Sequence, residues 1–228
     1  MQATDLLRHI DHAILSPTLT EREILAGCEL ALQHRVAACV VPPVWLPLIA
    51  PRLAGSGVAA ATTCGFPLGQ HTTAAKTVEA CDAVYAGAEE IDMVMNYAAL
   101  RSGYAHLVEQ DIRAVVDACG YAAQRTGRAP VVVKVIVEMC YLSEEEKRLG
   151  VELCAAAGAN FVKTSTGMGP GGATLKDVAL LRRLAPPEMG VKAAGGIKTA
   201  AECERFLEAG ASRLGTSATA AIADEMSV

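Results

Sequence analysis

The chain has 228 residues, of which 52% are hydrophobic and 20% charged, and its formal net charge is −5. This length allows a sizeable core in one large domain or two small ones. The negative balance, with no run of Lys and Arg among aromatic residues, argues against a nucleic-acid partner, although a local cluster of cations would still suit a small anionic substrate.

No segment resembles a signal peptide or a membrane span. The start, MQATDLLRHIDHAIL, is too charged for a signal peptide, and no stretch approaches the roughly 20 apolar residues of a membrane span. The eight cysteines include no CxxC pair and lie mostly among Ala and Val, which is typical of buried thiols in a reducing compartment. We therefore expect a cytoplasmic protein with no membrane partner.

Short apolar segments alternate with amphipathic segments from one end of the chain to the other. The middle apolar segments do not alternate with polar residues, as expected for strands that are covered on both faces. We expect eight strands, near residues 10–15, 37–41, 58–64, 90–95, 131–137, 161–165, 191–194 and 212–215.

The amphipathic segments carry helix start and stop signals. A Ser or Thr followed three residues later by Glu has the spacing of a capping box, and a glycine after the apolar run fits the left-handed position that closes a helix. These positions are Thr20, Ser143 and Thr199 for the starts and Gly87, Gly158 and Gly210 for the ends. The longest apolar run at helical intervals, within 72–85, consists of Ala75, Val78, Cys81 and Tyr85.

Strand and helix alternate without a linker, so we expect one domain over residues 1–228. Eight βα units in about 200 to 250 residues are typical of a (β/α)8 TIM barrel. The alternative is a doubly wound open sheet, but no GxGxxG follows the first predicted strand to favour it.

Four ionisable residues interrupt four consecutive predicted strands. They are Asp92 in EIDMVMN, Lys134 in VVVKVIVE, Lys163 in FVKTSTG and Lys192 in GVKAAGG. The chemistry of such barrels lies at the C-terminal ends of the strands. Because the outward face of each strand must meet apolar helices, we expect all four side chains to point into the barrel.

Three cations around one anion favour a catalytic site over a structural ion-pair network. A lone strand lysine is usually a surface residue whose ammonium reaches solvent, and a buried charge cluster can be a structural ion-pair network. Three lysines with one obvious acid, even with Glu138 added, are a poor balance for such a network. Burial and like charge lower a lysine pKa, and a neutral amine attacks carbonyl carbon to form a Schiff base. Either Lys163 or Lys192 would attack, with the other as its protonated neighbour and Asp92 as proton shuttle.

Segments rich in glycine and hydroxyl residues follow the last three predicted strands, at 166–174, 193–199 and 213–219. Each alone is typical of a turn, but barrels often bind phosphate with loops at this position. Backbone N–H groups of Gly195, Gly196, Ser217 and Ala218 would form such a nest. The five histidines show no HxxxH or HxH spacing, so we expect no catalytic metal.

The chain resembles the deoxyribose-phosphate aldolases, a family of class I Schiff-base aldolases. The resemblance runs through IDHAIL, ACVVPP, GFPLGQHTT, EIDMVMN, KVIVE, FVKTSTGMGPGGAT, VKAAGGIKT and RLGTSAT, of which KTSTG with VKAAGGI is the most specific. It implies a (β/α)8 barrel that needs no metal or organic cofactor. It also implies reversible cleavage of 2-deoxy-D-ribose 5-phosphate to acetaldehyde and D-glyceraldehyde 3-phosphate, and a homodimer.

The resemblance also implies individual roles. By motif, Lys163 matches the Schiff-base lysine, Lys192 the lysine that perturbs it, and Asp92 the acid/base carboxylate. The positions that match the substrate and phosphate pocket are Lys134, Thr166, Gly167, Gly195, Gly196, Ser217 and Ala218.

Three positions depart from the family pattern, which leaves efficiency and substrate preference open. Ala13 replaces a usual threonine, Met168 a usual phenylalanine or lysine, and Thr219 a common glycine. A Schiff-base aldolase for another phosphorylated sugar is therefore one alternative. A non-catalytic barrel that binds sugar phosphate, in which the lysines only neutralise the ligand, is another.

Overall fold

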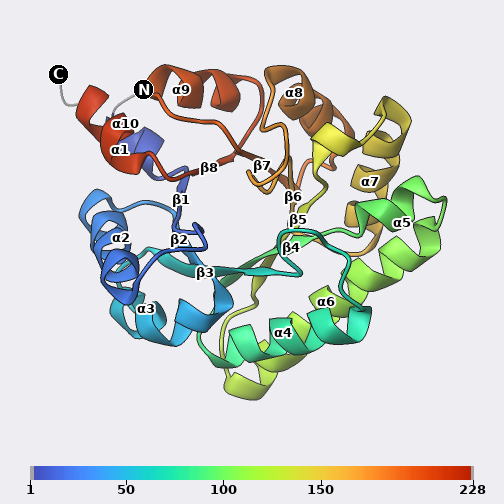
Figure 1. Cartoon of the computed structure of the whole chain (residues 1–228), viewed down its shortest axis with the longest axis horizontal. Coiled ribbons are helices and arrows are strands. Elements are labelled where there is room, and N and C mark those ends of the chain that lie inside the picture. The colour runs from blue at the N-terminus through green and yellow to red at the C-terminus, as the bar shows by residue number, and fades with distance from the viewer. Residues whose placement is uncertain (1–2, 227–228) are drawn as a thin grey trace.

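The computed structural model describes residues 3–226, which form one closed barrel of parallel strands surrounded by helices (Figure 1). The strands pair in chain order from β1 to β8, and β8 pairs with β1. The strands are β1 (Ile10–Ala13), β2 (Ala38–Val41), β3 (Ala59–Cys64), β4 (Glu90–Val94), β5 (Val132–Ile136), β6 (Phe161–Lys163), β7 (Gly190–Ala194) and β8 (Arg213–Thr216). The predicted barrel is confirmed and the open sheet is wrong. Residues 1–2 and 227–228 of the expected domain lie outside the described residues.

Each predicted strand is present, and the largest differences are at β1 and β6, which stop at Ala13 and Lys163 instead of residues 15 and 165. Thr164 still donates its N–H to the Lys192 carbonyl at 3.0 Å. Two residues later, the Thr166 N–H donates to the Glu138 carboxylate at 3.2 Å instead of to a strand. A side-chain acceptor therefore ends the ladder early.

The helices lie outside the barrel, and both described ends of the chain are on the same side, where α1 and α10 are neighbours (Figure 1). The α-helices are α1 (Ala3–Leu7), α2 (Glu21–His34), α3 (Leu46–Leu53), α4 (Thr73–Tyr85), α5 (Tyr97–Arg101), α6 (Ala105–Thr126), α7 (Glu144–Ala156), α8 (Leu175–Leu184), α9 (Ala200–Glu208) and α10 (Thr219–Glu225), and the 3₁₀ turns are η1 (Pro43–Trp45) and η2 (Met139–Tyr141). No helix among the described residues is both long and apolar enough to cross a membrane.

The predicted helix signals are confirmed. At α2, α7 and α9 the Glu three residues after the cap accepts the cap N–H, at 2.8, 2.7 and 3.1 Å. The glycine that follows α4, α7 and α9 has φ of 112°, 81° and 105°, in the left-handed region. These two devices satisfy backbone groups that have no partner inside the helix.

Of the apolar run of α4, Cys81 packs against the core, whereas Ala75, Val78 and Tyr85 are exposed. The buried residues of this helix are Lys76, Ala80, Ala83 and Val84, whereas Val78 is 61% exposed. Small residues on the buried face let α4 pack closely against α6. Helical spacing was therefore right, but it marked mostly the solvent side of this helix.

The barrel interior is divided into an apolar and a charged part. Ala38, Val40 and Ala61 form a small buried cluster on β2 and β3. Buried charged residues lie on the opposite strands, β4 to β7, and on β1. The larger apolar core packs between the outer faces of the strands and the helices.

Candidate active site

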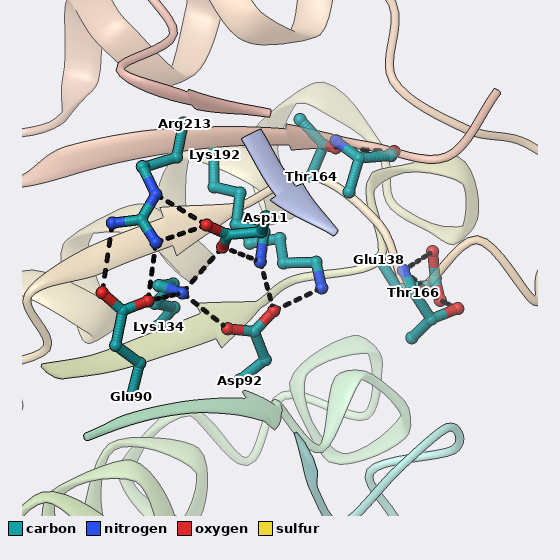
Figure 2. Close-up of polar contacts among 11 residues, drawn as sticks. Asp11, Glu90, Asp92, Lys134, Glu138, Thr164, Thr166, Lys192 and Arg213 are labelled. Carbon is teal, nitrogen blue, oxygen red and sulfur yellow. Dashed lines mark hydrogen bonds and ion pairs between the residues drawn. The ribbon is translucent and has the colours of Figure 1, made fainter. Parts of the chain in front are cut away.

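The four predicted ionisable residues meet inside the barrel, and three of them, Asp92, Lys134 and Lys192, are labelled in Figure 2. The Lys163 and Lys192 amines each donate to the same oxygen, Asp92 Oδ2, at 2.6 Å. Lys134 Nζ lies 3.2 Å from the other oxygen, Oδ1, as an ion pair. All four residues are buried, so the prediction that they point inward is confirmed. Only Lys163 ends its strand; the other three lie in mid-strand.

Three further charged residues complete the cluster, and none was among the predicted site residues. They are Asp11 of β1, Glu90 of β4 and Arg213 of β8. Arg213 donates to Asp11 Oδ1 through Nε at 2.7 Å and to Glu90 through Nη1 and Nη2 at 3.1 and 2.7 Å. Lys134 donates to Asp11 at 2.8 Å and also contacts Glu90. The expectation of a single obvious acid is therefore wrong.

The cluster has two layers, which Figure 2 shows side by side. In the deep layer, Asp11 and Glu90 balance Lys134 and Arg213. In the upper layer, one carboxylate, Asp92, serves both Lys163 and Lys192. Lys192 joins the layers because its amine also contacts Asp11. If every group were ionised, the excess positive charge would lie in the upper layer, beside the C-terminal end of β6.

The electrostatics favour loss of a proton from the upper layer. Burial lowers the pKa of Lys192 to about 8, assisted by Lys134 and Lys163 and opposed by the two aspartates. Burial opposes ionisation of Asp92, but the three lysines outweigh it and hold the pKa of this carboxyl well below its ordinary value. For Lys134, burial is likewise outweighed by the acids around it, which raise its pKa. The expected effect of burial on a lysine is thus confirmed at Lys192.

Two buried side-chain oxygens among the described residues have no hydrogen-bond partner, one on β4 and the other two residues after the end of β6. They are Asp92 Oδ1 and Ser165 Oγ; the contact of Lys134 with Oδ1 lacks hydrogen-bond geometry. A buried oxygen of this kind is uncommon, and it can accept a hydrogen bond from a donor that enters the site. Asp92 therefore has one oxygen held by two amines and the other available to such a donor.

The glycine segments after β6 and β7 lie against each other. Gly167, Gly195 and Gly196 have φ of 82°, 90° and 86°, which few other residues adopt. A Cβ on Gly195 would lie 3.4 Å from Gly167 Cα, and a Cβ on Gly172 would overlap the Gly195 carbonyl. These glycines therefore allow two backbone segments to approach closely at the C-terminal end of the barrel.

The donors of this region differ in their availability. The Ala218 N–H donates to Thr216 Oγ1 at 2.9 Å, and both donors of Thr166 are directed at Glu138. Within residues 3–226, the N–H groups of Gly196 and Ser217 donate to no other protein group, and both residues are exposed. Of the predicted phosphate residues, the structure thus brings Gly167 and Gly195 together and leaves Gly196 and Ser217 with free donors.

One departure from the family pattern has a structural explanation. Thr219 is fully buried at the start of α10, and its Oγ1 shares a 2.8 Å hydrogen bond with His12 Nδ1. Burial lowers the pKa of His12 to about 4, so its ring is neutral near pH 7. A glycine could not make this bond between α10 and β1.

Comparison with known proteins identifies the family. No protein-family model matches the chain. It is 44% identical over 218 residues to the deoxyribose-phosphate aldolase of Bacillus mycoides (strain KBAB4), covering 96% of this chain and 94% of that one. The enzyme of the same name from Listeria monocytogenes serotype 4a (strain HCC23) is 45% identical over 217 residues, covering 95% and 94%. The chain belongs to the deoxyribose-phosphate aldolase family.

Solved structures of this aldolase family have the same fold. A putative deoxyribose-phosphate aldolase from Coccidioides immitis superposes with a TM-score of 0.92 at 35% identity, covering all of this chain and 88% of that one. The deoxyribose phosphate aldolase of Aeropyrum pernix, described as a unique tetrameric structure, superposes with a TM-score of 0.89 at 32% identity. The match covers 99% of this chain and 92% of that one. The aldolase motifs therefore occupy a complete family barrel.

Proposed function

We infer that this protein is a lyase that reversibly cleaves 2-deoxy-D-ribose 5-phosphate to acetaldehyde and D-glyceraldehyde 3-phosphate through a lysine Schiff base. The observation that carries this inference is the pair of buried amines, Lys163 and Lys192, on one oxygen of Asp92. In a chain of this family, such a pair supplies both a nucleophile and an acid. A site that only bound phosphate would gain nothing from two amines at one buried carboxylate.

The first step we propose is attack by Lys163 on the carbonyl carbon of the open-chain sugar. Because both amines contact Asp92 Oδ2, a proton can pass from Lys163 to Lys192 through this carboxylate. Lys163 is then neutral and its lone pair forms the C–N bond of a carbinolamine. Asp92 and Lys192 return a proton to the carbinolamine hydroxyl, which leaves as water, and a protonated imine remains.

The imine then acts as an electron sink. The C2–C3 bond breaks when a base removes the proton of the C3 hydroxyl, C3 becomes the aldehyde carbon of the leaving product, and the bonding pair forms an enamine on Lys163. D-Glyceraldehyde 3-phosphate leaves, the enamine carbon takes a proton, and water hydrolyses the imine to acetaldehyde and free Lys163. We assign the proton transfers to Asp92, whose Oδ1 has no hydrogen-bond donor, acting directly or through water.

For the phosphate group, we propose the backbone of Gly167, Gly195, Gly196 and Ser217 as the binding site. Its support is the close approach of the two glycine segments and the free donors of Gly196 and Ser217. The Ala218 N–H is a weaker candidate because it already donates to Thr216. Lys134 lies in the deep layer, so we propose that it orients the carboxylates and does not touch phosphate.

The decisive experiment is reduction of the covalent intermediate. Acetaldehyde with borohydride should add mass irreversibly to Lys163, located by peptide mass spectrometry, and Lys163→Arg should abolish both the adduct and sugar cleavage. Turnover of 2-deoxyribose 5-phosphate, compared with 2-deoxyribose and other sugar phosphates, tests the substrate. Cleavage by Lys163→Arg at near wild-type rate would contradict the mechanism, and faster turnover of another sugar phosphate would contradict the substrate.

We also propose that the protein is a cytoplasmic homodimer. The location is supported by its eight free cysteines. Self-association is supported by an exposed apolar surface on η1 and α4, where Val44 and Val78 are 76% and 61% exposed. Light scattering should give the mass of two chains, and Val78→Lys should give one. A monomeric wild-type protein would refute the dimer.

A further inference from the structure

Glu138 has a backbone conformation that its residue type disfavours. Its φ of 53° and ψ of 64° are left-handed, and among the described residues only Arg35 shares a positive φ without being glycine. Arg35 closes α2, a common place for this conformation, and its N–H donates to carbonyls of that helix. Glu138 does not follow a helix. Strain of this kind persists where surrounding contacts impose it, often at functional sites.

The cause is a one-residue bulge between β5 and β6. In a regular parallel ladder, N–H groups two residues apart donate to carbonyls that are also two residues apart. Here the N–H groups of Val137 and Met139 donate to consecutive carbonyls, those of Lys163 and Thr164, at 3.0 and 2.9 Å. Glu138 is the extra residue, and bulges beside active sites typically redirect a side chain.

The redirected carboxylate holds Thr166. Both Glu138 oxygens accept the Thr166 N–H at 3.2 Å, and the Thr166 hydroxyl donates to Oε2 (Figure 2). The same hydroxyl accepts the Met168 N–H at 3.0 Å. Glu138 is 1% exposed, and its pKa is raised by burial, against the Thr166 hydrogen bonds and the charge of Lys163. The carboxylate therefore anchors Thr166, the third residue after the end of β6.

The segment from Thr166 to Gly172 is thereby held between two supports. On one side a Cβ on Gly169 would lie 3.6 Å from Glu138 Cδ, and on the other Gly172 meets the Gly195 carbonyl. Both donors of Thr166 are used in this anchoring, so they are not available to a phosphate oxygen, which can only accept.

We propose that Glu138 is a positioning residue that sets the shape of the Thr166–Gly172 segment and thereby its affinity for the phosphate end of the substrate. This inference rests on the proposed function, since it takes that segment as part of the phosphate site. Glu138 acts through Thr166 and does not touch the reacting carbon. Its loss should therefore affect binding of phosphorylated ligands and leave Schiff-base formation with acetaldehyde unchanged.

The test compares Glu138→Gly, which relieves the backbone strain but removes the anchor, with Glu138→Gln, which keeps an acceptor for the Thr166 N–H. Glu138→Gly should raise the KM for 2-deoxyribose 5-phosphate about tenfold, the loss expected for a hydrogen bond to a charged group. Its kcat/KM for unphosphorylated 2-deoxyribose and its borohydride trapping of acetaldehyde should match wild type. Glu138→Gln should have a KM for 2-deoxyribose 5-phosphate close to that of wild type. Arg35→Gly, the matched control for a left-handed residue, should leave the kinetics with both sugars unchanged.

Equal losses of kcat/KM for 2-deoxyribose 5-phosphate and for 2-deoxyribose, or no loss for either sugar, would overturn the proposal. If Glu138→Gly does not fold, Thr166→Val, which removes only the hydroxyl, should show a smaller rise in KM confined to the phosphorylated sugar. Failure of the proposed function is recognised separately, because the wild-type protein would then neither trap acetaldehyde nor cleave the sugar. In that case, binding of inorganic phosphate, weaker to Glu138→Gly than to wild type, still decides the role of Glu138.

Discussion

Replacing Arg213 with methionine should destabilise the protein strongly, because it unbalances the deep layer. Arg213 makes hydrogen bonds to both Asp11 and Glu90, and its removal leaves these two buried acids with Lys134 as the cation they share. Breaking a buried ion pair by deleting one partner costs about 3–5 kcal/mol. Since the Arg213 side chain is 15% exposed, we expect the free energy of unfolding to fall by an amount at the lower end of this range, about 3 kcal/mol.

For a chain of this size, such a loss lowers the midpoint of thermal unfolding by about 6–12 °C. The second variant, Arg213→Met with Glu90→Gln, removes one acid as well and restores the balance of the deep layer. It should therefore be more stable than Arg213→Met alone, although each substitution deletes contacts. Urea unfolding followed by circular dichroism measures both. A cost below about 1 kcal/mol for the single variant, or a double variant less stable than the single one, would refute the charge-balance argument.

Three other outcomes follow from the same contacts. Asp92→Asn should lower kcat/KM for 2-deoxyribose 5-phosphate by about 10²–10⁴-fold, as expected for loss of an acid/base group, and a loss below threefold would exclude that role. The rate of acetaldehyde trapping should fall about tenfold per pH unit below the Lys192 pKa of about 8 and level off above it. The reason is that only neutral Lys192 can accept the proton that Lys163 gives up before it attacks. A flat profile from about pH 6 to 9 would contradict this. Thr219→Val should lower the free energy of unfolding by about 1 kcal/mol by removing the bond to His12, whereas unchanged urea stability would show that this bond contributes nothing.

The sequence contained enough information to predict the barrel and the upper layer of the site. Apolar strands covered on both faces identify Asp92, Lys134, Lys163 and Lys192 as exceptions, and an exception in such a strand must point inward. The same rule applied to β4 would have found Glu90, which lies two residues before Asp92 and so on the same face.

Other parts of the site depend on contacts between distant segments. Arg213 is the first residue of β8, where a charged side chain is equally compatible with solvent. Asp11 reaches Lys134 and Lys192 only because β1 closes the barrel against β8. Nor does local sequence indicate that Glu138 occupies a bulge, since its residue type disfavours a positive φ. Glycine clusters indicated where the phosphate segments lie, but not which donors they keep.

The two layers together explain how a buried site can make and break a charged intermediate. In the proposed mechanism, the reactive state has neutral Lys163, charged Lys192 and ionised Asp92, so the upper layer is neutral overall. Imine formation places the positive charge on Lys163. The proton that converts the carbinolamine hydroxyl to water comes from Lys192, so the net charge of the upper layer does not change. The deep layer stays balanced throughout, since Asp11 and Glu90 face Lys134 and Arg213. Because a net charge in a buried site is costly, passing one proton between two amines on one carboxylate lets the covalent step proceed without creating it.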